Sequence, residues 1–137
     1  MKHKRAWIRL AVLLFPVLLL SGCVIHQGTD KVQDLEFTVA DVRELPKALQ
    51  EQLELKKEGE FKITYSDNEY LYIARGYGMR ETGGYSIAVN ECSLTENAIL
   101  VKTTLTGPQV GENVEKTPSY PYIVIKLELR SEPVVFE

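Results

Sequence analysis

Residues 61–74 read Phe61-Lys62-Ile63-Thr64-Tyr65-Ser66-Asp67-Asn68-Glu69-Tyr70-Leu71-Tyr72-Ile73-Ala74. In the first half of this stretch apolar and polar residues alternate, which is the period-two pattern of a strand with one buried face. Asp67 and Asn68 are typical turn residues, and the run from Tyr70 to Ala74 again favours a strand. The stretch therefore predicts an antiparallel hairpin closed by a short polar turn.

The segment before this hairpin predicts one helix, from Pro46 to Lys57. Proline suits the first turn of a helix, and the residues after it are strong helix formers. The apolar residues with helical spacing are Leu45, Leu49 and Leu53, with Ala48 and Leu55 as further candidates. Upstream of the helix, residues 35–39 alternate, which indicates a strand with Leu35, Phe37 and Val39 inward.

Downstream of the hairpin the pattern is β throughout. Strands are expected over residues 85–94, 99–105 and 121–129, with a short edge strand at 134–136. In the first of these, Ile87 and Val89 lie on one face, whereas Cys92 and Leu94 fall on the other. Either a bulge near residues 90–91 restores the register, or the strand is covered on both faces. Residues 35–137 therefore predict a single α+β domain, with one helix packed on a mostly antiparallel β-sheet or sandwich.

Residues 1–22 have the features of a lipoprotein signal peptide. Four basic residues and no acidic residue occur in this segment, and an apolar run follows from Leu10 to Leu20. That run is much shorter than the roughly 20 residues of a membrane-spanning helix. A cleaved signal peptide is therefore favoured over a transmembrane anchor.

The signal ends in Leu20-Ser21-Gly22-Cys23, which resembles the lipobox of bacterial lipoproteins. The resemblance implies cleavage before Cys23, which then carries a diacylglycerol thioether and acyl chains such as palmitate, enough for stable anchoring. The alternative is a free cysteine near an ordinary cleavage site. We expect residues 23–34 to form the lipidated cysteine and a flexible tether, with the protein held at the extracytoplasmic face of the cell membrane.

Cleavage before Cys23 leaves an acidic chain. The 137 residues contain 16 Lys+Arg and 19 Asp+Glu, and removing residues 1–22 leaves 12 basic against 19 acidic residues, a formal charge of −7. Nucleic acid is therefore not an expected partner, because phosphate binding needs a concentrated basic face. With Cys23 lipidated, Cys92 is the remaining thiol, so no disulfide is expected and Cys92 is interpreted as a buried apolar residue.

The residues for several catalytic mechanisms are missing from the predicted domain. Both histidines, His3 and His26, precede it, which excludes a Ser-His-Asp triad and a His-rich zinc site there. No nucleotide-binding fingerprint occurs. Chance pairs among 19 acidic residues are inevitable, and a solvated face is the preferred interpretation. We therefore expect no catalytic residues, no metal site and no cofactor.

Two successive glycines, Gly83 and Gly84, stand between predicted strands. Such a pair permits a positive φ or a close main-chain approach, so this segment is either a structural turn or a recognition loop. All seven tyrosines lie in the β region, and tyrosine suits recognition surfaces as well as strands. The candidate partner-binding residues are Thr82, Gly83, Gly84, Tyr85, Tyr120 and Tyr122.

The order of these motifs carries a family resemblance. Roughly from Leu71 to Leu129 the chain is similar to the PrcB C-terminal domain family, on the motifs Thr82-Gly83-Gly84-Tyr85-x-Ile87, Pro108 and Tyr120-Pro121-Tyr122. That family takes its name from an accessory subunit of a cell-surface protease complex, and its members are typically small bacterial lipoproteins. The resemblance implies a noncatalytic envelope protein.

Two functions fit these expectations. In the first, a noncatalytic membrane-anchored lipoprotein binds a protein partner, such as a secreted protease, as an accessory module of a cell-envelope complex. In the second, the domain binds an envelope polymer or a small ligand, or hydrolyses one through carboxylates. A pocket with two convergent acids favours the second function, and a flat exposed aromatic patch favours the first.

Overall fold

A computed structural model describes residues 31–137. The predicted signal peptide, Cys23 and the first part of the predicted tether lie outside the described residues. In chain order the elements are β1 (Lys31–Asp34), β2 (Thr38–Val39), a 3-10 helix (Val42–Glu44), α1 (Lys47–Lys56), β3 (Glu60–Ser66), β4 (Tyr70–Tyr77), β5 (Ser86–Thr95), β6 (Ile99–Thr106), β7 (Tyr122–Glu128) and β8 (Val134–Phe136).

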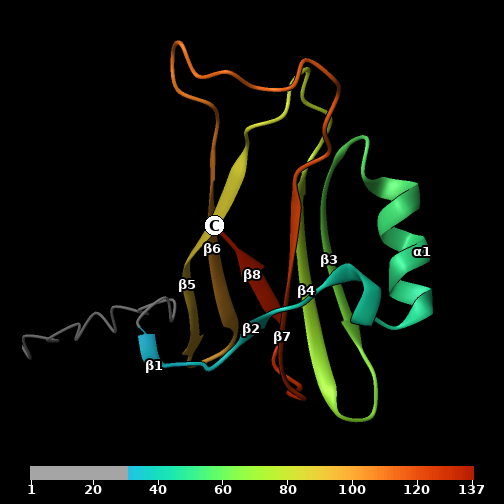
Figure 1. The fold of residues 1–137 in the computed structure, drawn as a ribbon. Helices are drawn as coiled ribbons and strands as arrows, with labels where there is room; N and C mark the ends of the chain where they lie inside the picture. Colours follow the sequence, from blue (N-terminus) through green and yellow to red (C-terminus); the bar gives the residue numbers. More distant parts are fainter. Residues whose placement is uncertain (1–30) are drawn as a thin grey trace, which may run out of the picture.

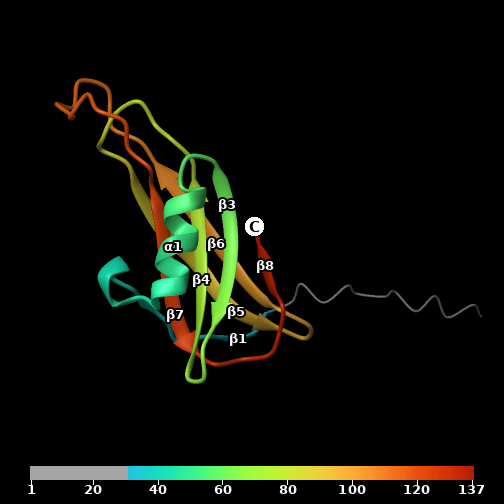
Figure 2. The ribbon, with the colours of Figure 1, turned by 90° about the vertical axis from the view of Figure 1, so that its right-hand side faces the viewer.

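The strands form two four-stranded sheets, in the orders β1-β5-β6-β8 and β2-β7-β4-β3. All pairs are antiparallel except β6 with β8. Figure 1 shows α1 beside the β2-β7-β4-β3 sheet, with β5, β6 and β8 on the other side of that sheet, and Figure 2 views the molecule from the helix side. The predicted α+β class, with one helix and mostly antiparallel sheet, is confirmed.

A first group of core residues fills the space between α1 and its sheet. The buried members are Leu45, Leu49, Leu53, Phe61, Ile63, Tyr72, Ala74 and Val124. The three leucines are the helical stripe expected from the sequence, and burying one leucine side chain stabilises a fold by about 1.5–3 kcal/mol. The two further candidates for this stripe are wrong, because Ala48 and Leu55 are exposed.

A second group of core residues comes from both sheets. Its buried members are Leu71, Ile73, Cys92, Ile99, Val101, Ile125 and Leu127. Cys92 is a free, buried cysteine, as expected. The register of β5 against β6 shifts between Val89 and Glu91, which confirms the bulge and explains how Val89 and Cys92 both reach the same core.

The hairpin predicted at residues 61–74 is confirmed as β3 and β4. Asp67 closes its turn by accepting hydrogen bonds from the main-chain N–H groups of Glu69 and Tyr70, at 2.8 and 2.7 Å. These bonds lower the pKa of the Asp67 carboxyl. The short strand expected at 134–136 is also present, as β8 at the edge of its sheet.

The strand predicted at residues 35–39 is wrong, because the chain changes sheets there. β1 pairs with β5 in one sheet, and β2 pairs with β7 in the other. Leu35 and Phe37 lie in the crossing and pack against the second core, but Val39 is 62% exposed. Residues 31–34, which we expected within the tether, belong to β1.

Candidate functional site

Two long loops join the sheets at one end of the molecule. Residues 78–85 connect β4 to β5, and residues 107–121 connect β6 to β7. Both views show these loops at the end of the sheets remote from β1, where the described chain begins (Figures 1 and 2). We call these two segments the loop pair.

Main-chain hydrogen bonds hold the loop pair together. Arg80 and Ser119 form an isolated antiparallel bridge. The N–H of Gly83 donates to the carbonyl of Glu115 at 2.9 Å, and the hydroxyl of Ser119 donates to the carbonyl of Thr82 at 2.7 Å. The two loops therefore brace each other, and each main-chain bond fixes part of a segment that has no strand of its own.

Position 84 requires a glycine, because its backbone conformation and its contact with the loop of residues 107–121 leave no room for a side chain. Its φ is +86°, in the left-handed region that favours glycine. A Cβ atom built there lies 2.6 Å from Cγ1 of Val114 and 3.2 Å from Cβ of Pro108. The loop of residues 107–121 thus rests directly on the main chain of Gly84, and the structure supports a structural role for this glycine.

Tyr85 is half-buried in the same assembly. An added Cβ on Gly107 lies 3.1 Å from the Tyr85 ring, and the Arg80 guanidinium carbon lies 5.7 Å from the centre of that ring. Nη2 of Arg80 also donates to the carbonyl of Tyr77 at 3.2 Å, while its Nε is buried without a hydrogen-bond partner. Tyr85 is therefore a bracing residue with part of its surface exposed.

The tip of the longer loop is a tight turn with an exposed apolar residue. The N–H of Glu112 donates to the carbonyl of Gln109 at 3.0 Å, and Gly111 has a φ of +84°, as in a type II turn. The Glu112 carboxylate accepts a second bond from the N–H of Gln109 at 2.9 Å. This turn holds Val110 fully exposed to solvent.

The two remaining candidate tyrosines lie on the helix side of the β7 sheet. Tyr122 packs against the first core and its ring centre is 6.0 Å from that of Phe61. Burial raises the pKa of its phenol. Tyr120 has its ring centre 5.0 Å from Nζ of Lys57, which follows the end of α1. Thr82, Gly83, Gly84, Tyr85 and Tyr120 thus all belong to the loop pair, with Tyr120 also beside Lys57 at the end of α1, whereas Tyr122 packs in the first core.

Val110 is not among the candidate residues predicted from the sequence. The signal was present in Pro108-Gln109-Val110-Gly111, since proline and glycine are both enriched in turns and glycine readily adopts a positive φ. What the sequence does not reveal is that the rest of the loop is anchored to residues 80–84, which leaves the turn projecting from the molecule.

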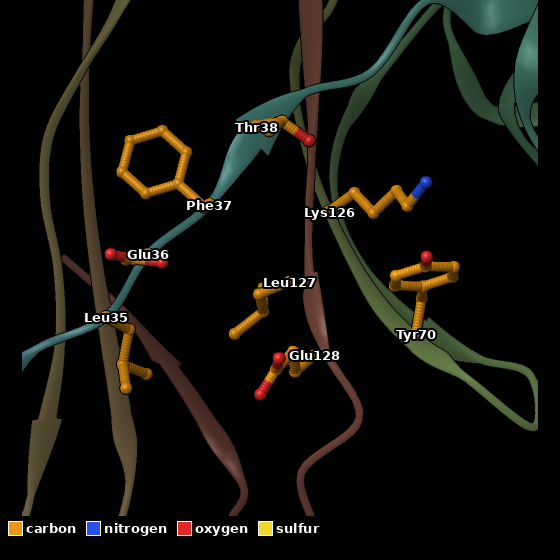
Figure 3. A pocket seen from close by; sticks show the side chains of 8 residues that line it. All are labelled: Leu35, Glu36, Phe37, Thr38, Tyr70, Lys126, Leu127 and Glu128. Atoms are coloured by element: carbon orange, nitrogen blue, oxygen red, sulfur yellow. The ribbon is translucent and has the colours of Figure 1, made fainter.

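A shallow groove lies where the chain crosses between the sheets, away from the loop pair. It has a volume of about 600 Å³ and is lined by Leu35, Glu36, Phe37, Thr38, Tyr70, Lys126, Leu127 and Glu128. Figure 3 shows Glu36 on the crossing segment and Glu128 on β7. Both glutamates are exposed, whereas a general acid needs a carboxyl shielded from water. The groove therefore suits binding better than hydrolysis.

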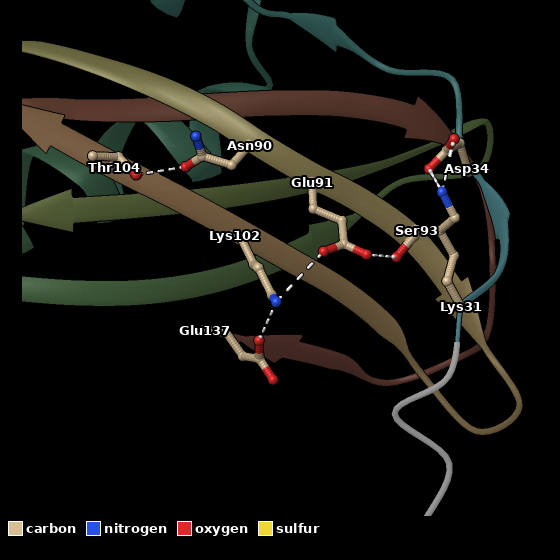
Figure 4. Close-up of polar contacts among 8 residues, drawn as sticks. All are labelled: Lys31, Asp34, Asn90, Glu91, Ser93, Lys102, Thr104 and Glu137. Atoms are coloured by element: carbon tan, nitrogen blue, oxygen red, sulfur yellow. Dashed lines mark hydrogen bonds and ion pairs between the residues drawn. The ribbon is translucent and has the colours of Figure 1, made fainter.

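Polar contacts surround the bulge of β5. Nζ of Lys102 lies 3.6 Å from a carboxylate oxygen of Glu91 and 2.8 Å from one of Glu137 (Figure 4). The hydrogen bond to Glu137 is the main cause that raises the pKa of Lys102. Exposed ion pairs contribute at most about 1 kcal/mol each, so this cluster adds only modestly to the contact of β5, β6 and the residue after β8.

Residues 31–137 contain neither a candidate metal-binding cluster nor a candidate membrane-spanning helix. Within this part of the chain, no group of three or more His, Cys, Asp or Glu residues is placed to hold a metal ion. No helix in the same range has both the length and the apolarity needed to cross a membrane.

The matched part of the chain runs from β4 through the loop pair to the end of β7. Residues 71–128 match the model of the PrcB C-terminal family. The match confirms the resemblance seen in the sequence, and both loops of the pair lie inside it. The helix α1, strand β3 and the crossing at residues 35–37 lie outside the PrcB C-terminal match. Among curated proteins and among solved structures, none matches the chain significantly.

Proposed function

We propose that this protein is a noncatalytic lipoprotein of the cell envelope that binds a protein partner through the loop pair. The observation that carries the proposal is the hydrogen-bonded turn at Gln109–Glu112, which presents Val110 fully to solvent. The PrcB C-terminal match over residues 71–128 supports an accessory role. A secreted or surface protease is the first class of partner to test.

The placement of the loop pair suits a tethered binding module. Cys23, the proposed site of lipidation, precedes Lys31 by eight residues, which span at most about 29 Å when fully extended. The loop pair lies at the end of the sheets remote from β1 (Figure 1). A lipid on Cys23 would hold the β1 end toward the membrane and leave the loop pair free to meet a partner.

The turn also suits a binding anchor on energetic grounds. An exposed valine gains about 1.5 kcal/mol or more when a partner pocket buries it. Ordering a loop on binding opposes that gain, but here Gly111, the Gln109–Glu112 bonds and the bridge to residues 80–84 order the loop in advance. Little of the binding free energy is then offset by the entropy cost of ordering this loop.

The proposal is tested by co-purification after crosslinking of intact cell envelopes. We expect wild type to recover a defined set of proteins and Val110→Asp to lose at least one of them. Leu55→Asp is the matched control, because Leu55 is 86% exposed on α1, outside the loop pair. Equal recovery by wild type and Val110→Asp would exclude the turn as the contact, and thermal unfolding confirms that both variants are folded.

A further inference from the structure

The groove of Figure 3 exists because strand pairing stops early at one edge. β2 pairs with β7 at Thr38 with Lys126 and at Val39 with Ile125. The N–H of Ala40 donates to the carbonyl of Val124, but no residue of the described chain before Thr38 pairs with β7. The same antiparallel register would place Glu36 opposite Glu128. Like charges directly opposite each other are destabilising, and the chain instead leaves β7 there and crosses to the other sheet. The end of β7 therefore has an open edge beside the groove (Figure 3).

The floor of the groove is apolar. Leu127 is 4% exposed and belongs to the second core. Leu35 and Phe37 are half-buried against that core on the opposite wall, and the ring of Tyr70 lies at one end (Figure 3). These side chains offer a surface for an aliphatic or aromatic group without any change in the fold.

The charges at the groove are unbalanced. The nearby cations are already engaged: Nζ of Lys126 lies 3.9 Å from the centre of the Tyr70 ring, and Arg130 pairs with Glu132 at 2.8 Å. Over residues 31–137, neither Glu36 nor Glu128 has an ion-pair or side-chain hydrogen-bond partner. In Figure 3 the ammonium group of Lys126 points toward Tyr70, away from both glutamates. Two uncompensated carboxylates thus flank an apolar floor.

We propose that this groove binds an extended peptide segment that carries lysine or arginine. The long stems of these side chains cover apolar surface while their charged ends reach polar groups, which matches Leu127 below and the two carboxylates on the walls. An extended segment also fits the open edge of β7, since adding a strand to an exposed edge is a common mode of peptide binding. The groove is separate from the loop pair, so this inference does not rest on a partner bound at the loops.

The test measures the fluorescence anisotropy of labelled five-residue peptides. The probe is fluorescein-Leu-Arg-Leu-Arg-Leu-amide, labelled at its N-terminus, with fluorescein-Leu-Glu-Leu-Glu-Leu-amide as its charge-reversed partner. The processed protein is held in phosphatidylcholine nanodiscs, and empty nanodiscs serve as the blank. We expect the arginine peptide to bind and the glutamate peptide to bind more weakly. Equal binding of the two peptides, or equal binding to empty nanodiscs, would overturn the proposal.

Variants then locate the binding site. The Glu36→Gln, Glu128→Gln double variant should weaken binding of the arginine peptide about fivefold, as expected for the loss of two exposed ion pairs. The control, Glu51→Gln with Glu96→Gln, removes the same charge at exposed positions outside the groove and should bind like wild type. Equal weakening in both double variants, or unchanged affinity in the first, would refute the groove as the site. Melting temperatures verify that all variants are folded.

Discussion

The main chains of Arg80 and Ser119 exchange two hydrogen bonds, from Arg80 N to Ser119 O at 2.8 Å and from Ser119 N to Arg80 O at 2.9 Å. These residues are far apart in the chain and belong to different connections between the sheets. The pairing makes one unit of two loops that lie outside both sheets. The stability of the loop pair therefore depends on contacts between the loops, among them the contact of Gly84 with Val114.

Replacement of Gly84 by alanine should destabilise the domain by about 1–2 kcal/mol, because a residue with a Cβ is strained at a φ of +86°. The contact with Val114 adds to this cost. Gly83→Ala is the control, since Gly83 has no positive φ and its added Cβ would lie 3.7 Å from the nearest atom. Chemical denaturation of the two variants checks the difference, and equal stabilities would show that Gly84 does not brace the loops.

Truncation of Leu49 should show how much α1 depends on its packing. Leu49 is 0% exposed in the first core, and Leu49→Ala should cost about 2–5 kcal/mol. Leu55→Ala lies on the same helix with an exposed side chain and should change stability by less than about 0.5 kcal/mol. Thermal or urea unfolding measures both, and similar losses would contradict the placement of the helix.

Cys92 should resist thiol reagents until the domain unfolds. Burial, and secondarily the charge of Asp34, raises the pKa of this thiol to about 11. In a Cys23→Ser protein, Cys92 is the only thiol, so its labelling at pH 8 should be slow in buffer and fast in denaturant. Fast labelling of the native protein would show that β5 does not bury this residue.

The raised pKa of Cys92 predicts the direction in which the stability of the domain changes with pH. The folded pKa of Cys92 lies above the value of about 9 for an unperturbed thiol. The unfolded chain therefore ionises first as pH rises. The contribution of the Cys92 thiol to the free energy of unfolding is fully present below pH 9. It should be lost progressively between pH 9 and 11. A Cys92→Ala variant should lack this part of the pH dependence, and an identical alkaline profile would contradict it.

Replacement of Cys23 by serine should move the protein from the membrane fraction to the soluble fraction. Serine has no thiol, so the diacylglycerol thioether that would anchor the protein cannot form. The domain should remain folded, since Cys23 precedes the first strand of the described fold. Fractionation with immunoblotting measures the distribution, and near-ultraviolet circular dichroism verifies the fold. Retention of Cys23→Ser in membranes would refute lipid anchoring at this residue.

The spacing of apolar residues in the sequence predicts individual secondary-structure elements of this fold, but it does not predict which sheet a strand joins. The hairpin of β3 and β4 and the helix α1 follow from the spacing of apolar residues. For β5 the spacing leaves two alternatives, and the structure shows that the bulge is the right one. The crossing at residues 35–37 does not follow from the spacing, because alternation reports which face of a strand is buried and says nothing about which sheet it joins. For the same reason Lys31–Asp34 were expected in the tether, although they pair with β5.

In the candidate site, too, the sequence marks a local backbone feature but does not show where each side chain lies in the fold. The glycine pair of residues 83–84 marks a special backbone position from the sequence alone, and Gly84 has the positive φ. Tyr122 and Tyr85 share a residue type, yet one packs beneath α1 and the other braces the loops. Only the tertiary arrangement distinguishes them, and only the contact of the two loops shows that Val110 projects from the molecule.

The central claim is that the turn at Val110 contacts a protein partner, and site-specific photo-crosslinking tests it most directly. A benzoylphenylalanine residue is placed at position 110 in one strain and at position 55 in another, and intact envelopes are irradiated. Both positions are exposed, so both probes have equal access to chance encounters. We predict a discrete crosslinked adduct from position 110 and none from position 55. No adduct from position 110, or the same adducts from both positions, would contradict the account.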